Sequence, residues 1–98
     1  MIDALIAGHI SGDPEQRAGK AETVYVVAKV RVQAGDGEIY PVNVIAFDSH
    51  VCQLLLDLRD GDAVSLTGSL TPKVWTDKQG NSRPVVDLVA HKVLARAP

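Results

Sequence analysis

The chain has 98 residues, of which 46% are hydrophobic and 22% charged, and its formal net charge is −2 at pH 7. This length fits one modest core, so we expect residues 1–98 to form a single domain. No apolar run approaches the roughly 20 residues that span a membrane, and the acidic start of the chain does not resemble a secretory signal. The single cysteine, Cys52, cannot form an internal disulfide, which indicates a reducing, cytoplasmic environment.

Alternating apolar residues predict a first strand over residues 2–10, which ends at the turn sequence of residues 11–14. After a polar loop, the alternation resumes over residues 23–33 and predicts a second strand. One face of that strand is apolar and is expected to lie in the core. The other face carries an aromatic residue and two cations: Tyr25, Lys29 and Arg31.

A glycine-containing turn at residues 34–37 leads into a third predicted strand over residues 38–47, which should pair antiparallel with the second. Its inner face is apolar. Its outer face also carries apolar residues beside Asn43, namely Ile39, Pro41, Ile45 and Phe47. Hydrophobic residues on an exposed face are typical of a binding or subunit surface.

Helical spacing of apolar residues predicts a short helix over residues 50–58, capped by Asp48 or Ser49 and closing one end of the core. A fourth strand is predicted over residues 63–70 and continues as an arm to Trp75. Residues 77–81 turn the arm back, and residues 85–94 form the fifth strand. Five strands with one helix between the third and fourth predict an all-β OB-fold, a five-stranded Greek-key barrel.

The predicted arm places the only tryptophan, Trp75, among three cations: Lys73, Lys78 and Arg83. An indole face stacks on any base and cations meet phosphates, so this combination indicates binding to a nucleic-acid strand without base readout. The alternative is a solvated hairpin tip whose tryptophan packs on its own stem. On the second strand, Tyr25 is a further stacking platform or a subunit contact, and Lys29 and Arg31 are candidate phosphate contacts.

Catalytic and metal-binding patterns are missing from the sequence. The three histidines, His9, His50 and His91, are widely separated and have no cysteine or carboxylate at metal-ligand spacing. There is also no nucleophile elbow, phosphate-cradling glycine loop or paired-acid motif. We therefore predict a protein that is not an enzyme and uses no metal or cofactor.

Four segments resemble the family of bacterial single-stranded DNA-binding proteins. Residues 8–17 are similar to the family's Gly-x-Leu-x-x-Asp-Pro-Glu-x-Arg turn, and residues 73–80 match its Lys-Trp-Thr-Asp-x-x-Gly arm. Between them, residues 42–47 and 58–64 fall in the family's order and spacing. The resemblance covers nearly the whole chain.

This resemblance implies an OB-fold, usually a homotetramer, that wraps single-stranded DNA over aromatic and basic side chains in replication, repair and recombination. Carried over by position, it identifies Trp75 and Phe47 as stacking platforms. Asn43 stands where the family often has a cation, and Pro41 where a stacking aromatic is common. These departures predict weaker binding than is usual in the family, because each missing base stack forfeits about 1–3 kcal/mol.

The chain ends at Pro98 without the flexible linker and acidic tip by which family members recruit replication partners. We therefore expect no recruiting tail. Either the sequence is the core of a longer protein, or it is a short paralogue, for example of phage or mobile-element origin. In either case the resemblance implies a bacterial, cytoplasmic and nucleoid-associated protein.

The sequence thus favours sequence-independent binding of single-stranded DNA by a homo-oligomer, a tetramer or else a dimer. One alternative is a primosomal replication protein N-like OB protein, which also binds helicase-loading partners. Another is an OB-fold interaction module that has lost DNA binding. The acidic net charge, Pro41 and Asn43 favour the interaction module, whereas the basic arm of residues 73–83 opposes it.

Overall fold

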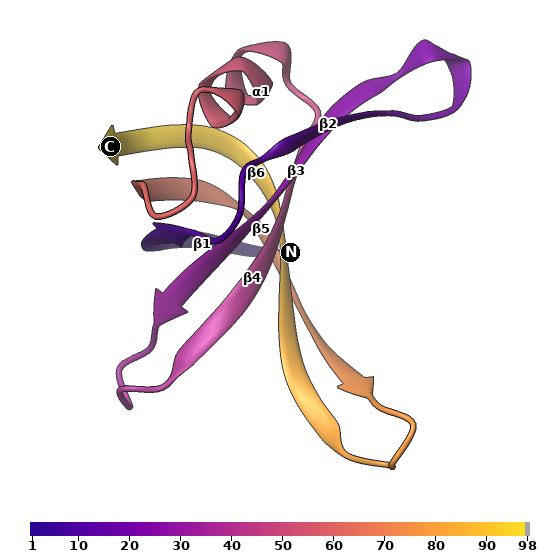
Figure 1. The fold of residues 1–98 in the computed structure, drawn as a ribbon, viewed down its shortest axis with the longest axis vertical. Helices are drawn as coiled ribbons and strands as arrows, with labels where there is room; N and C mark the ends of the chain where they lie inside the picture. The colour runs from indigo at the N-terminus through magenta and orange to yellow at the C-terminus, as the bar shows by residue number, and fades with distance from the viewer. Residues whose placement is uncertain (98) are drawn as a thin grey trace.

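The computed structural model describes residues 1–97, except for the side chains of Trp75 and Arg83. Figure 1 shows the elements in chain order: β1 (Ile2–Ile10), β2 (Glu15–Ala18), the 3-10 turn η1 (Lys20–Glu22), β3 (Val24–Gln33), β4 (Ile39–Ala46), α1 (Ser49–Leu56), β5 (Ala63–Thr76) and β6 (Ser82–Ala97). Neither helix in this part of the chain is long and apolar enough to cross a membrane.

Five strands close into a barrel in the order β1-β5-β6-β4-β3, and a pairing of β1 with β3 completes the ring. All neighbours are antiparallel except β4 and β6, which run parallel. Closure depends on Gly8, because a Cβ at this position would overlap the carbonyl oxygen of Arg31 on β3. The predicted all-β Greek-key barrel is present.

One detail of the predicted topology is wrong. The helix lies between β4 and β5, not between the third and fourth strands, because an additional strand, β2, precedes it. β2 occupies part of the segment that was expected to be a polar loop, and it pairs with the start of β3. All four of its residues are exposed, so it has no apolar face to produce an alternating pattern.

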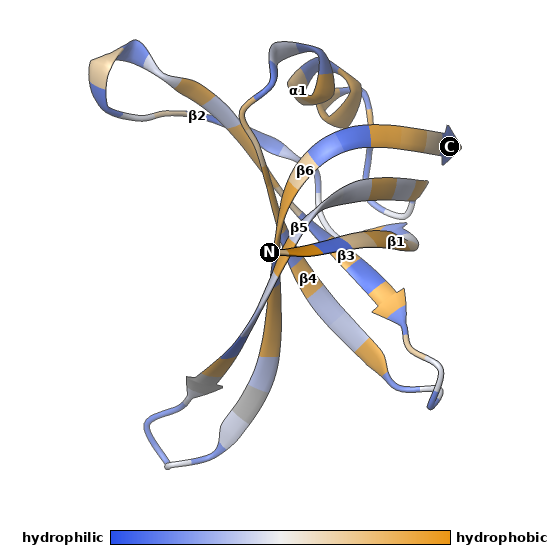
Figure 2. Ribbon diagram, turned by 180° about the vertical axis from the view of Figure 1, so that it is seen from behind, coloured by the Kyte–Doolittle hydropathy of each residue, from blue (hydrophilic) through white to orange (hydrophobic). Residues whose placement is uncertain are grey.

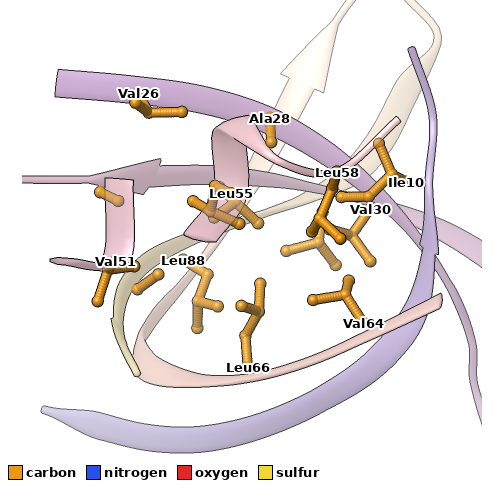
Figure 3. Close-up of a cluster of buried hydrophobic side chains, with 14 of the residues drawn as sticks. Ile10, Val26, Ala28, Val30, Val51, Leu55, Leu58, Val64, Leu66 and Leu88 are labelled. Atoms are coloured by element: carbon orange, nitrogen blue, oxygen red, sulfur yellow. The ribbon is translucent and has the colours of Figure 1, made fainter. Parts of the chain in front are cut away.

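The core fills the barrel with aliphatic side chains from every barrel strand and from α1. Figure 3 shows Leu55 of α1 among Leu66 and Leu88 of the strands, and all three are fully buried. The helix begins where expected, since the Asp48 side chain accepts a hydrogen bond from the amide of Val51 (3.1 Å). Hydrophobic and hydrophilic residues alternate along the barrel strands in Figure 2, which is the pattern that produced the strand predictions.

Strands β5 and β6 extend well beyond the barrel as a paired arm, which is the hairpin that ends in the orange segment of Figure 1. The arm was predicted, but β6 is longer than the expected residues 85–94. Its first residues pair with the end of β5 in the arm, and its last residues pair with Ala63 and Val64 at the start of β5. Pairing with β5 therefore sets the length of β6, and the apolar pattern of β6 itself does not.

Candidate nucleic-acid interface

The outer faces of β3, β4 and β6 form one continuous surface. Lys29 on β3 pairs with Asn43 on β4, and Asn43 in turn lies beside Asp87 on β6. A groove of about 810 Å³ runs over this surface, bordered by the loop of residues 11–13, by β2 and by β5. In OB-folds, the second and third barrel strands and the loops that flank them are the usual oligonucleotide surface.

Two aromatic rings meet at one end of this groove. Val27 and Ile45 line the groove as a cross-strand pair; Tyr25 lies two residues before Val27 on β3, and Phe47 directly follows the end of β4. The ring centroids of Tyr25 and Phe47 are 6.0 Å apart with planes inclined at 47°. Phe47 is 53% exposed, so it does not pack beneath the helix and its ring remains accessible to a base.

Three cations line the groove, and two of them already have a carboxylate partner. Arg17 pairs with Glu15 (3.3 Å), and the Lys73 ammonium lies 2.7 Å from an oxygen of Asp87. Among the described side chains, Lys29 has no ion pair. It is the groove cation that can meet a phosphate without first losing a partner.

Asp87 is a feature that sequence reasoning missed. Its second oxygen accepts a hydrogen bond from the Asn43 side chain (3.1 Å). The hydrogen bond from Lys73 is the largest influence on its pKa, and together with the Asn43 contact and the lysine charge it lowers the pKa of this carboxyl, against a smaller opposing effect of burial. Only the parallel pairing of β4 with β6, which no local pattern predicts, brings Asn43 next to Asp87.

The groove is not a basic channel. Its lining holds three cations, Arg17, Lys29 and Lys73, and three acids, Asp13, Glu15 and Asp87, so the formal charges cancel. The acids are all engaged by other groups, since Asp13 accepts a hydrogen bond from the amide of Asp60 (3.0 Å). Electrostatic attraction of a strand to this groove is therefore weaker than the number of its cations suggests.

Arg31 lies apart from these residues. It borders a second hollow of about 570 Å³, together with His9 and Arg96, whose floor consists largely of small residues of β1, β5 and β6. No acidic residue lines this hollow among those described. The structure thus places two predicted phosphate contacts, Lys29 and Arg31, in different surface depressions.

The arm holds the remaining predicted residues. Lys78 is exposed in the turn, and the Asp77 carboxylate organises that turn by accepting hydrogen bonds from the amides of Gln79 and Asn81, both 2.9 Å. Trp75 and Arg83 face each other in the backbone register of β5 and β6. Their side chains lie outside what the structure describes.

The other sequence motif, around residues 8–17, has a structural role in this fold. Gly12 has a positive φ of 77° and donates its amide to the Asp60 side chain (2.7 Å), while Asp60 donates its own amide to Asp13. These reciprocal bonds tie the loop after β1 to the loop after α1. They fix one wall of the groove.

The sequence profile of the single-strand binding protein family matches residues 1–95. The chain belongs to this family. The family that the motifs indicated is therefore confirmed, and with it the expected class of function, single-stranded DNA binding, at the level of the family. No curated protein sequence shows significant similarity to the chain.

Solved structures share the fold of this family member. The small single-stranded DNA-binding protein of Streptomyces coelicolor is 19% identical with a TM-score of 0.71, covering 98% of this chain and 92% of its own. A mitochondrial single-stranded DNA-binding protein of S. cerevisiae is 17% identical with a TM-score of 0.69, covering 94% and 91%. The Plasmodium falciparum protein, solved in complex with single-stranded DNA, is 12% identical with a TM-score of 0.65, covering 91% and 85%. These similarities confirm the OB-fold.

No group of three or more histidine, cysteine or acidic side chains with metal-binding geometry occurs within the described part of the chain. The buried thiol of Cys52 donates to the Ala46 carbonyl (3.2 Å), and desolvation raises its pKa. It therefore has a packing role rather than the character of a nucleophile.

Proposed function

We propose that residues 1–98 act as one non-enzymatic domain that binds single-stranded DNA without sequence preference, in replication, repair or recombination. The observation that carries this proposal is the convergence, on the oligonucleotide face of an OB-fold, of an aromatic pair with Lys29, which has no ion pair among the described side chains. Stacking accepts every base, and phosphate contacts are the same at every nucleotide.

In this proposal the strand follows the groove from Tyr25 and Phe47 toward the β5–β6 arm. Bases stack on Phe47, Tyr25 and Trp75. Asn43 is a neutral hydrogen-bonding neighbour of the strand. The phosphates meet the cations predicted from sequence, which are Lys29, Arg31, Lys73, Lys78 and Arg83. Because the groove charges cancel, binding is expected to depend more on stacking than is usual for a basic channel.

The lone tryptophan provides the test. Thymine oligonucleotide would be added to the protein at low and at moderate salt while Trp75 fluorescence is followed. Saturable quenching that weakens with salt is expected, because a stacked base quenches indole and salt competes for phosphate contacts. Trp75→Ala should weaken binding by about 1–3 kcal/mol in a parallel filter-binding titration.

A second function, a protein-interaction module of the same fold, is favoured by the balanced charges of the groove and by the exposed Ile39. Absence of fluorescence quenching together with absence of a gel shift at low salt would support this second function over the first.

We also infer that the chain self-associates, as a homotetramer or else a dimer, in a bacterial cytoplasm where it is nucleoid-associated. Leu5 and Ile39 are large apolar residues with more than half of their surface exposed, whereas Ile45, which was expected to be exposed with Ile39, is half-buried and lines the groove. Exposed apolar surface of this kind favours subunit contacts. Light scattering at micromolar concentration should give a mass above that of the monomer.

A further inference from the structure

Asp87 lines the groove and binds two of the donors that surround it. Its carboxylate receives the ammonium of Lys73 at 2.7 Å and the amide of Asn43 at 3.1 Å. Both donors are groups that the proposed function assigns to the strand. The carboxylate resembles a phosphate in charge and in its acceptor oxygens, so it satisfies the same donors in the free protein.

The Lys73–Asp87 pair is only partly shielded from solvent. The side chains of Lys73 and Asp87 are 60% and 32% exposed. An ion pair at such a surface is weak, so Lys73 can leave it. The Asp87 carboxylate then remains as an unpaired negative charge beside the incoming nucleic-acid backbone. A phosphate that enters the groove therefore gains one cation contact and acquires one repulsive neighbour.

We propose that Asp87 limits the affinity of the groove for single strands by competing with phosphate for Lys73. The inference rests on the proposed function and deepens it: Asp87 is the residue that sets how tightly this face holds a nucleic-acid backbone. Lys29 has no such partner among the described side chains, so its contribution to phosphate binding does not depend on Asp87. The contribution of Lys73 to phosphate binding is reduced by Asp87.

A different role for Asp87 would predict the opposite effect. If the carboxylate held Lys73 in its DNA-binding position, removing its charge would weaken binding. The competition model predicts stronger binding instead, because a lysine side chain reaches a phosphate without a fixed support and the repulsive charge is gone. The direction of the change therefore separates the two roles.

The test compares Asp87→Asn with Asp3→Asn in a thymine oligonucleotide titration at low salt. An asparagine at position 87 retains an oxygen that can accept from Asn43. Asp3 is the matched control, because it is an exposed acid on β1 that lines neither the groove nor the hollow of Arg31. Both variants raise the net charge by one. Asp87→Asn should raise affinity about three- to tenfold, and Asp3→Asn by less than about twofold.

A double-mutant cycle with Lys73→Gln tests the mechanism itself. In the natural chain this substitution should leave the slope of log affinity against log salt nearly unchanged, since Asp87 keeps the lysine from phosphate, although the unpaired Asp87 charge lowers the affinity itself. In the Asp87→Asn background it should lower affinity about fivefold and reduce the slope of log affinity against log salt by about 0.7. Equal reductions of the slope in the two backgrounds would overturn the proposal, as would unchanged or weaker binding by Asp87→Asn.

The same titrations distinguish failure of the competitor role of Asp87 from failure of the proposed function. If the natural chain binds the oligonucleotide but Asp87→Asn binds no more tightly, the function stands and the competitor role is wrong. If neither protein binds while both unfold cooperatively on heating, strand binding itself is wrong, and the competitor role falls with it.

Discussion

The ring of Phe47 lies against the ring of Tyr25, with centroids 6.0 Å apart and planes inclined at 47°. This is within the range of favourable aromatic contacts, so each ring restricts the motion of the other. A platform that is already ordered loses less conformational entropy when a base stacks on it. In the proposed function the pair is therefore a preorganised stacking surface, in which Tyr25 acts in part by positioning Phe47.

Replacing Phe47 by alanine should weaken oligonucleotide binding by about 1–3 kcal/mol, because one stacked base loses its platform. Leu94→Ala is the matched control, since Leu94 is similarly exposed (50%, against 53% for Phe47) but lies on β6 opposite the start of β5 and not beside Tyr25. Filter binding at constant salt measures both. Equal affinities for the two variants would exclude Phe47 from the strand path.

Lys29 should account for about one phosphate contact. Lys29→Gln is expected to lower affinity at low salt and to reduce the slope of log affinity against log salt by about 0.7, because one fewer counterion is released from the strand. Lys92→Gln on β6, exposed and outside the groove, is the control and should leave the slope unchanged. An unchanged slope for Lys29→Gln would mean that this lysine meets no phosphate.

Arg31 should contribute less than Lys29 to the binding of a short strand, since it borders a different hollow on the same face of β3. Arg31→Gln is expected to lower the affinity for a thymine oligonucleotide of about 8 nucleotides by less than Lys29→Gln does, and to have a larger effect on the affinity for one of about 30. Equal effects at both lengths would show that one short strand reaches both depressions.

The barrel could be predicted because its strands have one buried and one solvated face. In the segments of residues 23–33 and 38–47, alternation separated the core residues from the outer surface that holds Lys29, Asn43 and Phe47. β2 could not be predicted this way. Both faces of β2 are exposed to solvent. The strand forms because the start of β3 extends beyond the barrel and offers free backbone donors and acceptors.

The sequence predicted individual residues of the candidate site but not how they are arranged relative to one another. The sequence indicated the outward residues of each strand but not their cross-strand neighbours, so the ion pair of Lys73 with Asp87 and the separation of Arg31 from the groove were not foreseen. The ion pair depends on the antiparallel register of β5 and β6, in which Lys73 lies diagonally across from Asp87, and the separation of Arg31 depends on the curvature of the barrel. A lone acid among the apolar residues of the fifth predicted strand was the one available signal for Asp87.

Cys52 should be inert in the folded protein. Its thiol is buried, donates to the Ala46 carbonyl and has a pKa raised by desolvation, so the reactive thiolate is scarce and inaccessible. A disulfide reagent at mildly alkaline pH is expected to label it at the rate of unfolding and to label it at once in denaturant. Rapid labelling without denaturant would show that the barrel end beneath α1 opens readily.

Acid should remove the stability that Asp87 contributes. Its pKa is lowered in the folded state, chiefly by the hydrogen bond from Lys73, so near pH 4 and below the unfolded chain binds its proton more readily than the folded chain. The contribution is therefore complete above the ordinary aspartate value of 3.8 and is lost as pH falls through the lower folded value.

Thermal unfolding of the natural chain and of Asp87→Asn should reveal this loss between about pH 6 and pH 2.5. Other acids titrate in both proteins, so their effects cancel in the difference between the two midpoints. The natural chain should unfold at the higher temperature near neutrality, by a small margin because the ion pair is partly exposed, and the margin should close below about pH 4. A margin independent of pH would mean that the carboxylate stabilises the folded chain through its shape and not through its charge.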